Sequence, residues 1–140
     1  YFQSVITWVE ATFIKKRKKW MNGLDWGYMY NEFKDNVYDA KKIEEETKAL
    51  ILDDDVTNKR GIYLYILTHK EKYLSIRTFT DAQRQEVYEK QHGVCPICGK
   101  HFDLGEMDAD HITPWSKGGH TLIGNCQMLC KECNRRKGNR

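Results

Sequence analysis

Four of the five cysteines in this 140-residue chain form two Cys-x-x-Cys pairs. The first pair is Cys95 and Cys98, and the second is Cys130 and Cys133. A two-residue gap lets both thiolates of a pair point at one ion, and two pairs complete the tetrahedron that structural Zn²⁺ requires. Because the thiolates fill all four positions, we expect one structural zinc ion with no catalytic role.

Two other uses of the cysteines are disfavoured. Disulfides would need an oxidising compartment, which no feature of the sequence supports. A thioredoxin-like redox site would need one Cys-x-x-Cys pair in a βαβ unit, whereas this chain has two pairs near its C-terminus. The fifth cysteine, Cys126, is expected to be a small buried residue and not a ligand.

The segment between the pairs, residues 99–129, is too long for a simple zinc ribbon, so it must fold separately. Asp110 and His111 are adjacent within it, and Asn134 directly follows the second pair. An imidazole can take a proton from water near neutral pH, while a carboxylate and an amide oxygen suit Mg²⁺ or Mn²⁺. Phosphodiester cleavage needs such an activated water and stabilisation of the charge that develops on the phosphate.

This region resembles the HNH nuclease family over residues 80–140. The resemblance rests on D-H-I-x-P-x-S-x-G-G, on N-x-x-x-L-C-x-x-C-N and on a basic tail, in this order and spacing. It implies a ββα unit that holds a divalent ion between strand and helix. It also implies His111 as general base, Asp110 and Asn134 as ligands of the ion, and Asn125 as a brace for the loop and for His111.

Two points about the motif bear on the expected chemistry. Asn134 stands where many family members have histidine, and an amide binds soft metals less well, so we expect a preference for Mg²⁺ and Mn²⁺. Asp108 could be a second carboxylate at the ion, or it could lie outside the site.

Residues 130–140 carry five basic residues and one acidic residue, Arg140 among the basic ones. Of these, Arg135, Arg136 and Lys137 are expected to hold backbone phosphates without sequence preference.

The elements around the motif are expected to give an α+β protein, with a mostly α-helical N-terminal segment before the small ββα domain. Thr80 and Gln83 form a capping-box pattern that predicts a helix to about residue 91. We therefore place the nuclease-like domain at residues 79–140 and a helical accessory segment at 5–78. Residues 1–4 resemble the remnant of a cleavable tag, so the chain is expected to be a fragment.

Within the accessory segment, apolar residues at three- and four-residue spacing predict one amphipathic helix over residues 5–22. It contains the basic run 15–19, which is expected to be a solvated helix face. Asp39 is expected to cap a second helix. The apolar stretch 61–67 could be a short helix or a buried strand, and its pattern does not separate the two.

The bulk properties narrow the function only slightly. A net charge of +3 is too small to indicate nucleic acid by itself. No apolar run is long enough for a membrane span, and no export signal is present, so we expect an intracellular, cytoplasmic protein without membrane contact. The sequence does not predict an oligomeric state.

Three functions compete for this pattern. The first is a metal-dependent endonuclease acting on nucleic acid, most simply DNA, and serving in restriction or phage defence. The second is a zinc-stabilised nucleic-acid-binding module without catalysis, which has no need of a base beside a hard-metal ligand. The third is a zinc-dependent protein-interaction domain, which would leave the Asp-His pair unexplained. The stretch 61–77 weakly resembles bacterial proteins in which a ParB-like domain precedes the nuclease, so such an upstream domain is expected.

Overall fold

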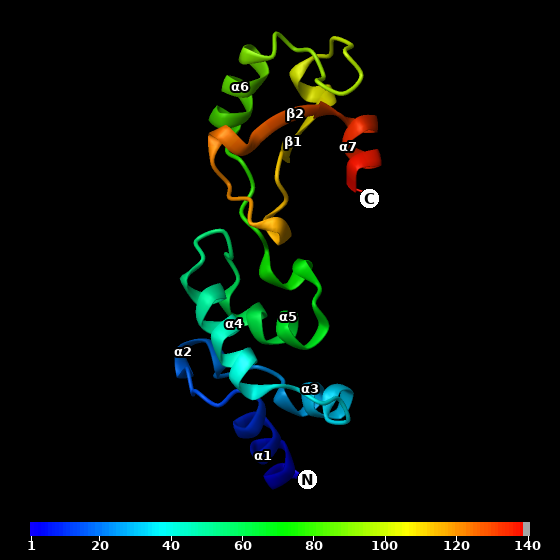
Figure 1. The fold of residues 1–140 in the computed structure, drawn as a ribbon. Coiled ribbons are helices and arrows are strands. Elements are labelled where there is room, and N and C mark those ends of the chain that lie inside the picture. Colours follow the sequence, from blue (N-terminus) through cyan, green and yellow to red (C-terminus); the bar gives the residue numbers. More distant parts are fainter. Residues whose placement is uncertain (139–140) are drawn as a thin grey trace. The chain divides into compact units, whose positions relative to one another are not determined.

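The computed structural model describes residues 1–138 and divides into two compact units, residues 1–76 and residues 77–140 (Figure 1). This division falls two residues before the boundary expected from the sequence. Arg140, one of the basic residues of the tail, lies outside the described residues. None of the helices described is long and apolar enough to cross a membrane.

The first unit is helical, as the sequence predicts. Its elements are α1 (Phe2–Thr12), α2 (Lys18–Met21), α3 (Trp26–Phe33), α4 (Ala40–Leu52), α5 (Ile62–Thr68) and the short 3₁₀ turns η1 (Lys59–Gly61) and η2 (Glu71–Leu74). Residues 2–4, which the tag interpretation set aside, are part of α1.

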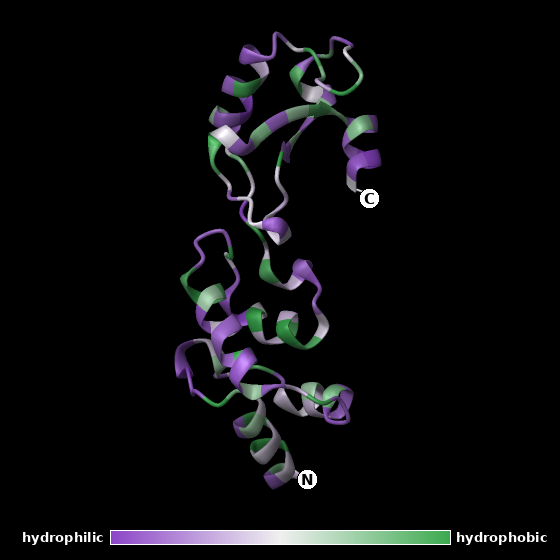
Figure 2. Cartoon of the chain, in the orientation of Figure 1, coloured by the Kyte–Doolittle hydropathy of each residue, from purple (hydrophilic) through white to green (hydrophobic). Residues whose placement is uncertain are grey.

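The core of this unit forms around α5, whose apolar residues show as a green band in Figure 2. Tyr63 is fully buried, and its ring lies 5.0 Å from the ring of Phe13 and 5.7 Å from that of Trp26, between centroids. Burial of these aromatic rings contributes to the hydrophobic stabilisation of the unit. The stretch 61–67, whose type the sequence left open, is therefore a buried helix.

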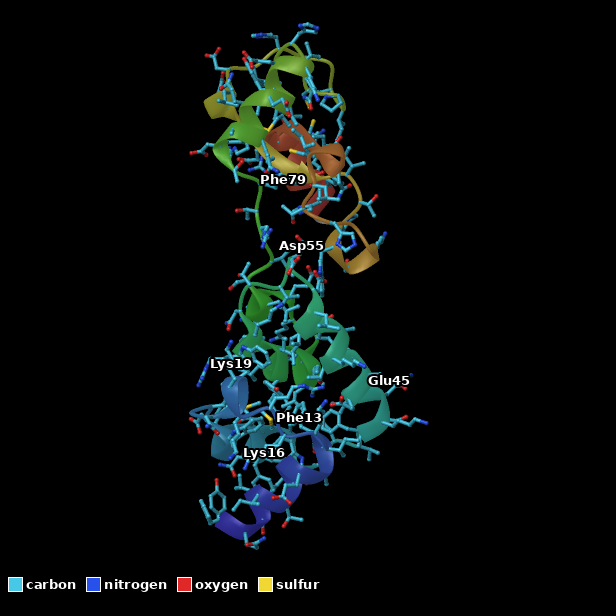
Figure 3. All side chains as sticks on the ribbon, turned by 90° about the vertical axis from the view of Figure 1, so that its left-hand side faces the viewer. Phe13, Lys16, Lys19, Glu45, Asp55 and Phe79 are labelled. Atoms are coloured by element: carbon cyan, nitrogen blue, oxygen red, sulfur yellow. The ribbon has the colours of Figure 1, made fainter. Side chains whose placement is uncertain are left out.

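The single helix expected over residues 5–22 is wrong. α1 ends at Thr12 and α2 begins at Lys18, with an irregular segment between them. Consecutive like charges repel one another along a helix, and Arg17 leaves the basic run to make a bidentate pair with Glu44, with both N–O distances 2.7 Å. The expected solvated surface is present nonetheless, because Lys16 and Lys19 are exposed (Figure 3).

Local capping signals in the two units are confirmed. The Asp39 carboxylate accepts hydrogen bonds from the backbone N–H groups of Lys41 and Lys42 at the start of α4. Thr80 and Gln83 form the expected capping box at the start of α6 (Asp81–Lys90). Each cap satisfies backbone donors that the first turn of a helix leaves unpaired, so the caps determine where these helices begin.

The second unit contains a two-stranded antiparallel sheet, which confirms the α+β class. Strand β1 is Met107–His111, strand β2 is Cys126–Cys130, and helix α7 (Lys131–Gly138) follows β2 directly. Short 3₁₀ turns complete the unit: η3 (Leu104–Glu106), η4 (Trp115–Lys117) and η5 (Ile123–Asn125).

The register of this sheet determines which side chains share a face. Ala109 pairs with Met128, and Asp110 pairs with Gln127. One face belongs to the core, where Met107 and Met128 are fully buried and pack in a cluster with Phe79 and Val87. Because side chains alternate along a strand, Asp108 and Asp110 lie together on the other face.

Candidate functional site

The four paired cysteines meet at one end of the second unit. Cys95 lies in a tight turn closed by a bridge between Val94 and His101, and Gly99 adopts a φ of +75° there. The Gly99 N–H donates to the Cys95 carbonyl oxygen at 2.8 Å. A residue with a side chain is strained at this positive φ, so glycine is the fitting residue after the first pair.

The second pair is positioned by the junction of strand and helix. Cys130 is the last residue of β2, and Cys133 lies in the first turn of α7. The backbone N–H of Cys133 donates to the Cys130 sulfur at 3.4 Å. All four sulfur atoms lie within 4.8 Å of one another, and the sulfur atoms of Cys98 and Cys130 are 4.0 Å apart.

These distances fit a tetrahedral metal site, in which a metal–sulfur distance of about 2.3 Å places sulfur atoms roughly 3.8 Å apart. Burial raises the pKa of the Cys95 thiol, but backbone hydrogen bonds near Cys98 and Cys130 outweigh it and lower the pKa to about 6. The hydrogen bond to Cys130 raises the pKa of Cys133 to about 12. Four thiolates this close together repel one another, so a fully ionised cluster needs a cation at its centre. Cys126 is not a member of this cluster.

The face of β1 that carries Asp108 and Asp110 lies against α7. Three α7 residues, spaced at i, i+3 and i+6, reach this face: Lys131, Asn134 and Lys137. Such spacing places side chains along one side of a helix. Figure 2 shows α7 coloured hydrophilic over most of its length, as expected for a helix that offers polar groups to a site.

The partners of the two carboxylates differ. Asp108 accepts from Lys131 Nζ at 3.1 Å through Oδ1 and from Asn134 Nδ2 at 3.4 Å through Oδ2. Asp110 accepts from Gln127 Nε2 at 2.9 Å and from Lys137 Nζ, both through Oδ2. A carboxylate oxygen can only accept, so it is the amide nitrogen of Asn134 that faces Asp108, and its oxygen is left for another partner.

His111 lies on the core face of the same strand. Its ring packs on Phe79 with a centroid distance of 4.6 Å, and its Nε2 lies 2.9 Å from Thr121 Oγ1. The Thr121 hydroxyl donates to the Arg77 carbonyl oxygen at 3.0 Å. With that proton directed to the carbonyl, the Thr121 Oγ1 is placed to accept from Nε2–H of His111.

Asn125 closes the loop between the strands with a single amide group. Its Oδ1 accepts from the Thr113 backbone N–H at 2.8 Å, and its Nδ2 donates to the carbonyl oxygens of Thr113 and His120 at 3.0 and 2.9 Å. Gly119 completes the closure, because a Cβ there would lie 1.7 Å from the Thr113 carbonyl oxygen. Asn125 thus contacts the loop backbone, and no hydrogen bond among the described residues links its side chain directly to His111.

The structure brings Asp110 and Asn134 to one face without a hydrogen bond between them, since Asn134 bonds to Asp108 instead. Arg135 and Arg136 are exposed, as phosphate-binding residues should be, whereas Lys137 is only 24% exposed and turns towards Asp110. The sequence motifs do not single out Gln127 or Thr121. The pairing register would have identified Gln127, because it stands opposite Asp110; no local signal identifies Thr121.

Comparisons with known proteins find similarity to nucleases. A family model described as HNH endonuclease matches residues 95–140. The chain is also similar to the CRISPR-associated endonuclease Cas9 of Corynebacterium diphtheriae, with 24% identity over 98 residues. That match covers 67% of this chain and 9% of the relative, so the chain spans a small fraction of the length of that protein.

Proposed function

Residues 95–140 form an HNH endonuclease domain, and from this premise we propose that the chain is a divalent-metal-dependent nuclease that hydrolyses phosphodiester bonds, with DNA as its substrate. One observation carries the proposal. Strand β1 presents an imidazole on one face and two carboxylates on the other, beside a helix that ends in basic residues. This combination supplies a base, hard oxygen ligands and phosphate-binding charge within one small unit.

His111 is the proposed general base. The hydrogen bond of its Nε2 to Thr121 holds the ring and leaves Nδ1 to take a proton from the attacking water. Packing of the ring on Phe79 limits its rotation. A base that is held in one orientation transfers a proton more efficiently than one that must be ordered during the reaction.

Asp110 and Asn134 are the proposed protein ligands of Mg²⁺ or Mn²⁺. A carboxylate and an amide oxygen are the hard ligands that these ions prefer, and the assignment of the Asn134 nitrogen to Asp108 leaves its oxygen available. When bound, the ion supplies charge stabilisation at the scissile phosphate. Asn125 is proposed as a positioning residue, because its three backbone hydrogen bonds fix the loop that follows His111.

Zn²⁺ is the proposed occupant of the four-cysteine site, with a structural role. The site joins the Cys95 turn to the start of α7, which carries Asn134. Four thiolates leave no open position on a tetrahedral ion, so this metal has no place for substrate. Its binding instead fixes the helix that presents the other functional residues.

Arg135, Arg136 and Lys137 are proposed to contact the phosphate backbone. Both arginines are exposed in the last helix, next to the carboxylate face. Contacts to phosphate carry affinity without sequence preference, so selectivity for a target must come from elsewhere in the protein. We therefore propose a role in restriction or phage defence, in which an upstream domain, such as a ParB-like one, selects the target and this domain cuts it.

A cleavage assay tests the proposal. The zinc-loaded chain should cut supercoiled or linear DNA with Mg²⁺ or Mn²⁺. It should lose this activity when a chelator removes that ion without affecting the substrate or the fold. His111→Ala should cut at a rate lower by roughly 10²–10⁴-fold, while His101→Ala, an exposed histidine beside the cysteine turn, should cut normally. If wild-type chain binds DNA but cuts none of the duplex, single-stranded or RNA substrates with either ion, the non-catalytic binding module becomes the better description.

A further inference from the structure

Lys137 differs from the other basic residues of α7 in where its charge lies. Its Nζ donates to Asp110 Oδ2, to the His111 carbonyl oxygen at 2.8 Å and to the Ile112 carbonyl oxygen at 3.3 Å. An ammonium group has three N–H donors, so these three acceptors use all of them. The side chains of Lys137 and Asp110 are 24% and 17% exposed, which makes this pair partly buried.

The neighbouring pair on the same face provides a contrast. Lys131 contacts Asp108 at 3.1 Å with a single hydrogen bond, and its side chain is 63% exposed. An exposed lysine can leave its partner at little cost, because water solvates both charges and the pair contributes little free energy. Lys137 is held by three acceptors, so its position at Asp110 is a specific feature of the fold.

This position conflicts with the ligand role of Asp110. Gln127 and Lys137 both use Asp110 Oδ2, which leaves Oδ1 for an ion, but an ion on Oδ1 still lies close to the ammonium, and two cations repel where solvent screening is reduced. Repulsion between the two cations therefore favours displacement of the Lys137 ammonium when the ion binds Asp110. The displaced ammonium stays tethered to the last turn of α7, next to Arg135 and Arg136.

We propose that Lys137 is the resident cation of the divalent-ion site: it neutralises Asp110 when no ion is bound, and it moves to a substrate phosphate when the ion takes its place. The inference rests on the proposed function, since it assumes that Asp110 is a ligand of the ion. Lys137 thereby weakens the affinity for the free ion. A nucleic-acid phosphate that accepts the ammonium removes this competition, so substrate and ion bind with positive coupling.

Mn²⁺ binding to the zinc-loaded chain, measured by electron paramagnetic resonance or calorimetry without DNA, tests the proposal. Lys137→Met keeps the length of the side chain and removes its charge, and it should lower the Mn²⁺ dissociation constant by roughly tenfold. Lys137→Arg keeps the charge and should leave the affinity near that of the wild type. The matched control is Lys131→Met, which removes a lysine from the same helix face and should change the affinity by less than about twofold.

The same titration with a short DNA duplex measures the coupling. Duplex should tighten Mn²⁺ binding to the wild type and should have a much smaller effect on Lys137→Met. If Lys137→Met does not fold, as judged by circular dichroism and zinc content, Lys137→Gln provides a second neutral side chain for the same measurements.

Three outcomes would contradict the proposal, and they differ in what else they affect. Equal or weaker Mn²⁺ binding in the neutral variants, with binding still abolished by Asp110→Ala, refutes the role of Lys137 alone. Equal coupling to DNA in wild type and neutral variant refutes the exchange between carboxylate and phosphate. Absence of Mn²⁺ binding in every folded variant overturns the ion site itself, and with it the proposed function.

Discussion

Asp110 and His111 are adjacent in the sequence, but their side chains lie on opposite faces of β1. Asp110 contacts Gln127 and Lys137, while His111 packs on Phe79 and contacts Thr121. The alternation of side chains along a strand produces this separation. It gives the two residues independent surroundings, so a proton-transfer group and a metal ligand can be removed one at a time.

Removal of each residue should therefore have a different effect. Asp110→Ala should weaken Mn²⁺ binding by about 100-fold or more, because a ligand is lost, and excess Mn²⁺ should restore part of the cleavage. His111→Ala should leave Mn²⁺ affinity within about twofold of wild type while the cleavage rate falls as expected for loss of a general base. Parallel titrations and single-turnover rates measure both. Equal losses of Mn²⁺ affinity in the two variants would contradict separate roles.

The cysteine cluster should contain one zinc ion per chain. Cys98→Ser should lower zinc content and unfold the second unit, because ligand binding free energy contributes directly to folding in small metal sites. Cys126→Ala is the control, since Cys126 lies outside the cluster and should leave zinc content unchanged. Elemental analysis and thermal melting measure the two effects. A metal-free chain that melts like the loaded one would rule out the structural role.

Asp108 should act on the ion through Asn134. Asp108→Ala removes the acceptor that orients the Asn134 amide, and loss of such an outer partner typically lowers metal affinity by about 10–100-fold. The loss should be smaller than that caused by Asp110→Ala. Asp108→Asn keeps an oxygen that can accept from Asn134 Nδ2, so it should recover most of the affinity. If Asp108→Asn is as damaging as Asp110→Ala, Asp108 is itself a ligand.

Arg136 should contribute to affinity for nucleic acid of any sequence. Its side chain is 71% exposed and, within residues 1–138, forms an ion pair with Glu132 on the same helix, which contributes little free energy of folding. Arg136→Ala should weaken binding equally for unrelated duplexes and reduce the slope of log affinity against log salt by about one. Fluorescence anisotropy at several salt concentrations measures this. Lys90→Ala, at the end of α6, is the control; a loss confined to one sequence would indicate base readout instead.

The Arg17–Glu44 pair should make the first unit sensitive to acid. The hydrogen bonds from Arg17 lower the pKa of the Glu44 carboxyl. A lowered folded-state pKa means that the stabilisation is complete above the pKa of glutamate in the unfolded chain, about 4.3, and is lost as pH falls through the lower folded value. Arg17→Met should therefore reduce the melting temperature at pH 7, and the difference from wild type should shrink below about pH 4. Lys18→Met, the exposed neighbour, should show neither effect.

Local sequence determined the parts of this protein that depend on short-range chemistry. Two Cys-x-x-Cys pairs specify a four-sulfur cluster because the spacing alone lets each pair reach one ion. The caps at Asp39 and Thr80 specify helix starts because the carboxylate or hydroxyl bonds to backbone only two or three residues away. The order of strand, loop, strand and helix in the nuclease-like domain followed from the resemblance to the HNH family, which depends on motifs local in the sequence.

Only the tertiary structure decided which partners these residues have. The break between α1 and α2 depends on Glu44, which lies far from Arg17 along the chain and gives the guanidinium a bidentate partner. The pairing of Asn134 with Asp108, and of Lys137 with Asp110, depends on strand register together with the rotation of α7 against β1. No local pattern encodes the strand register or the rotation of the helix, because both result from packing the buried faces of the sheet and the helix. The positions of those faces then determine which polar side chains become partners.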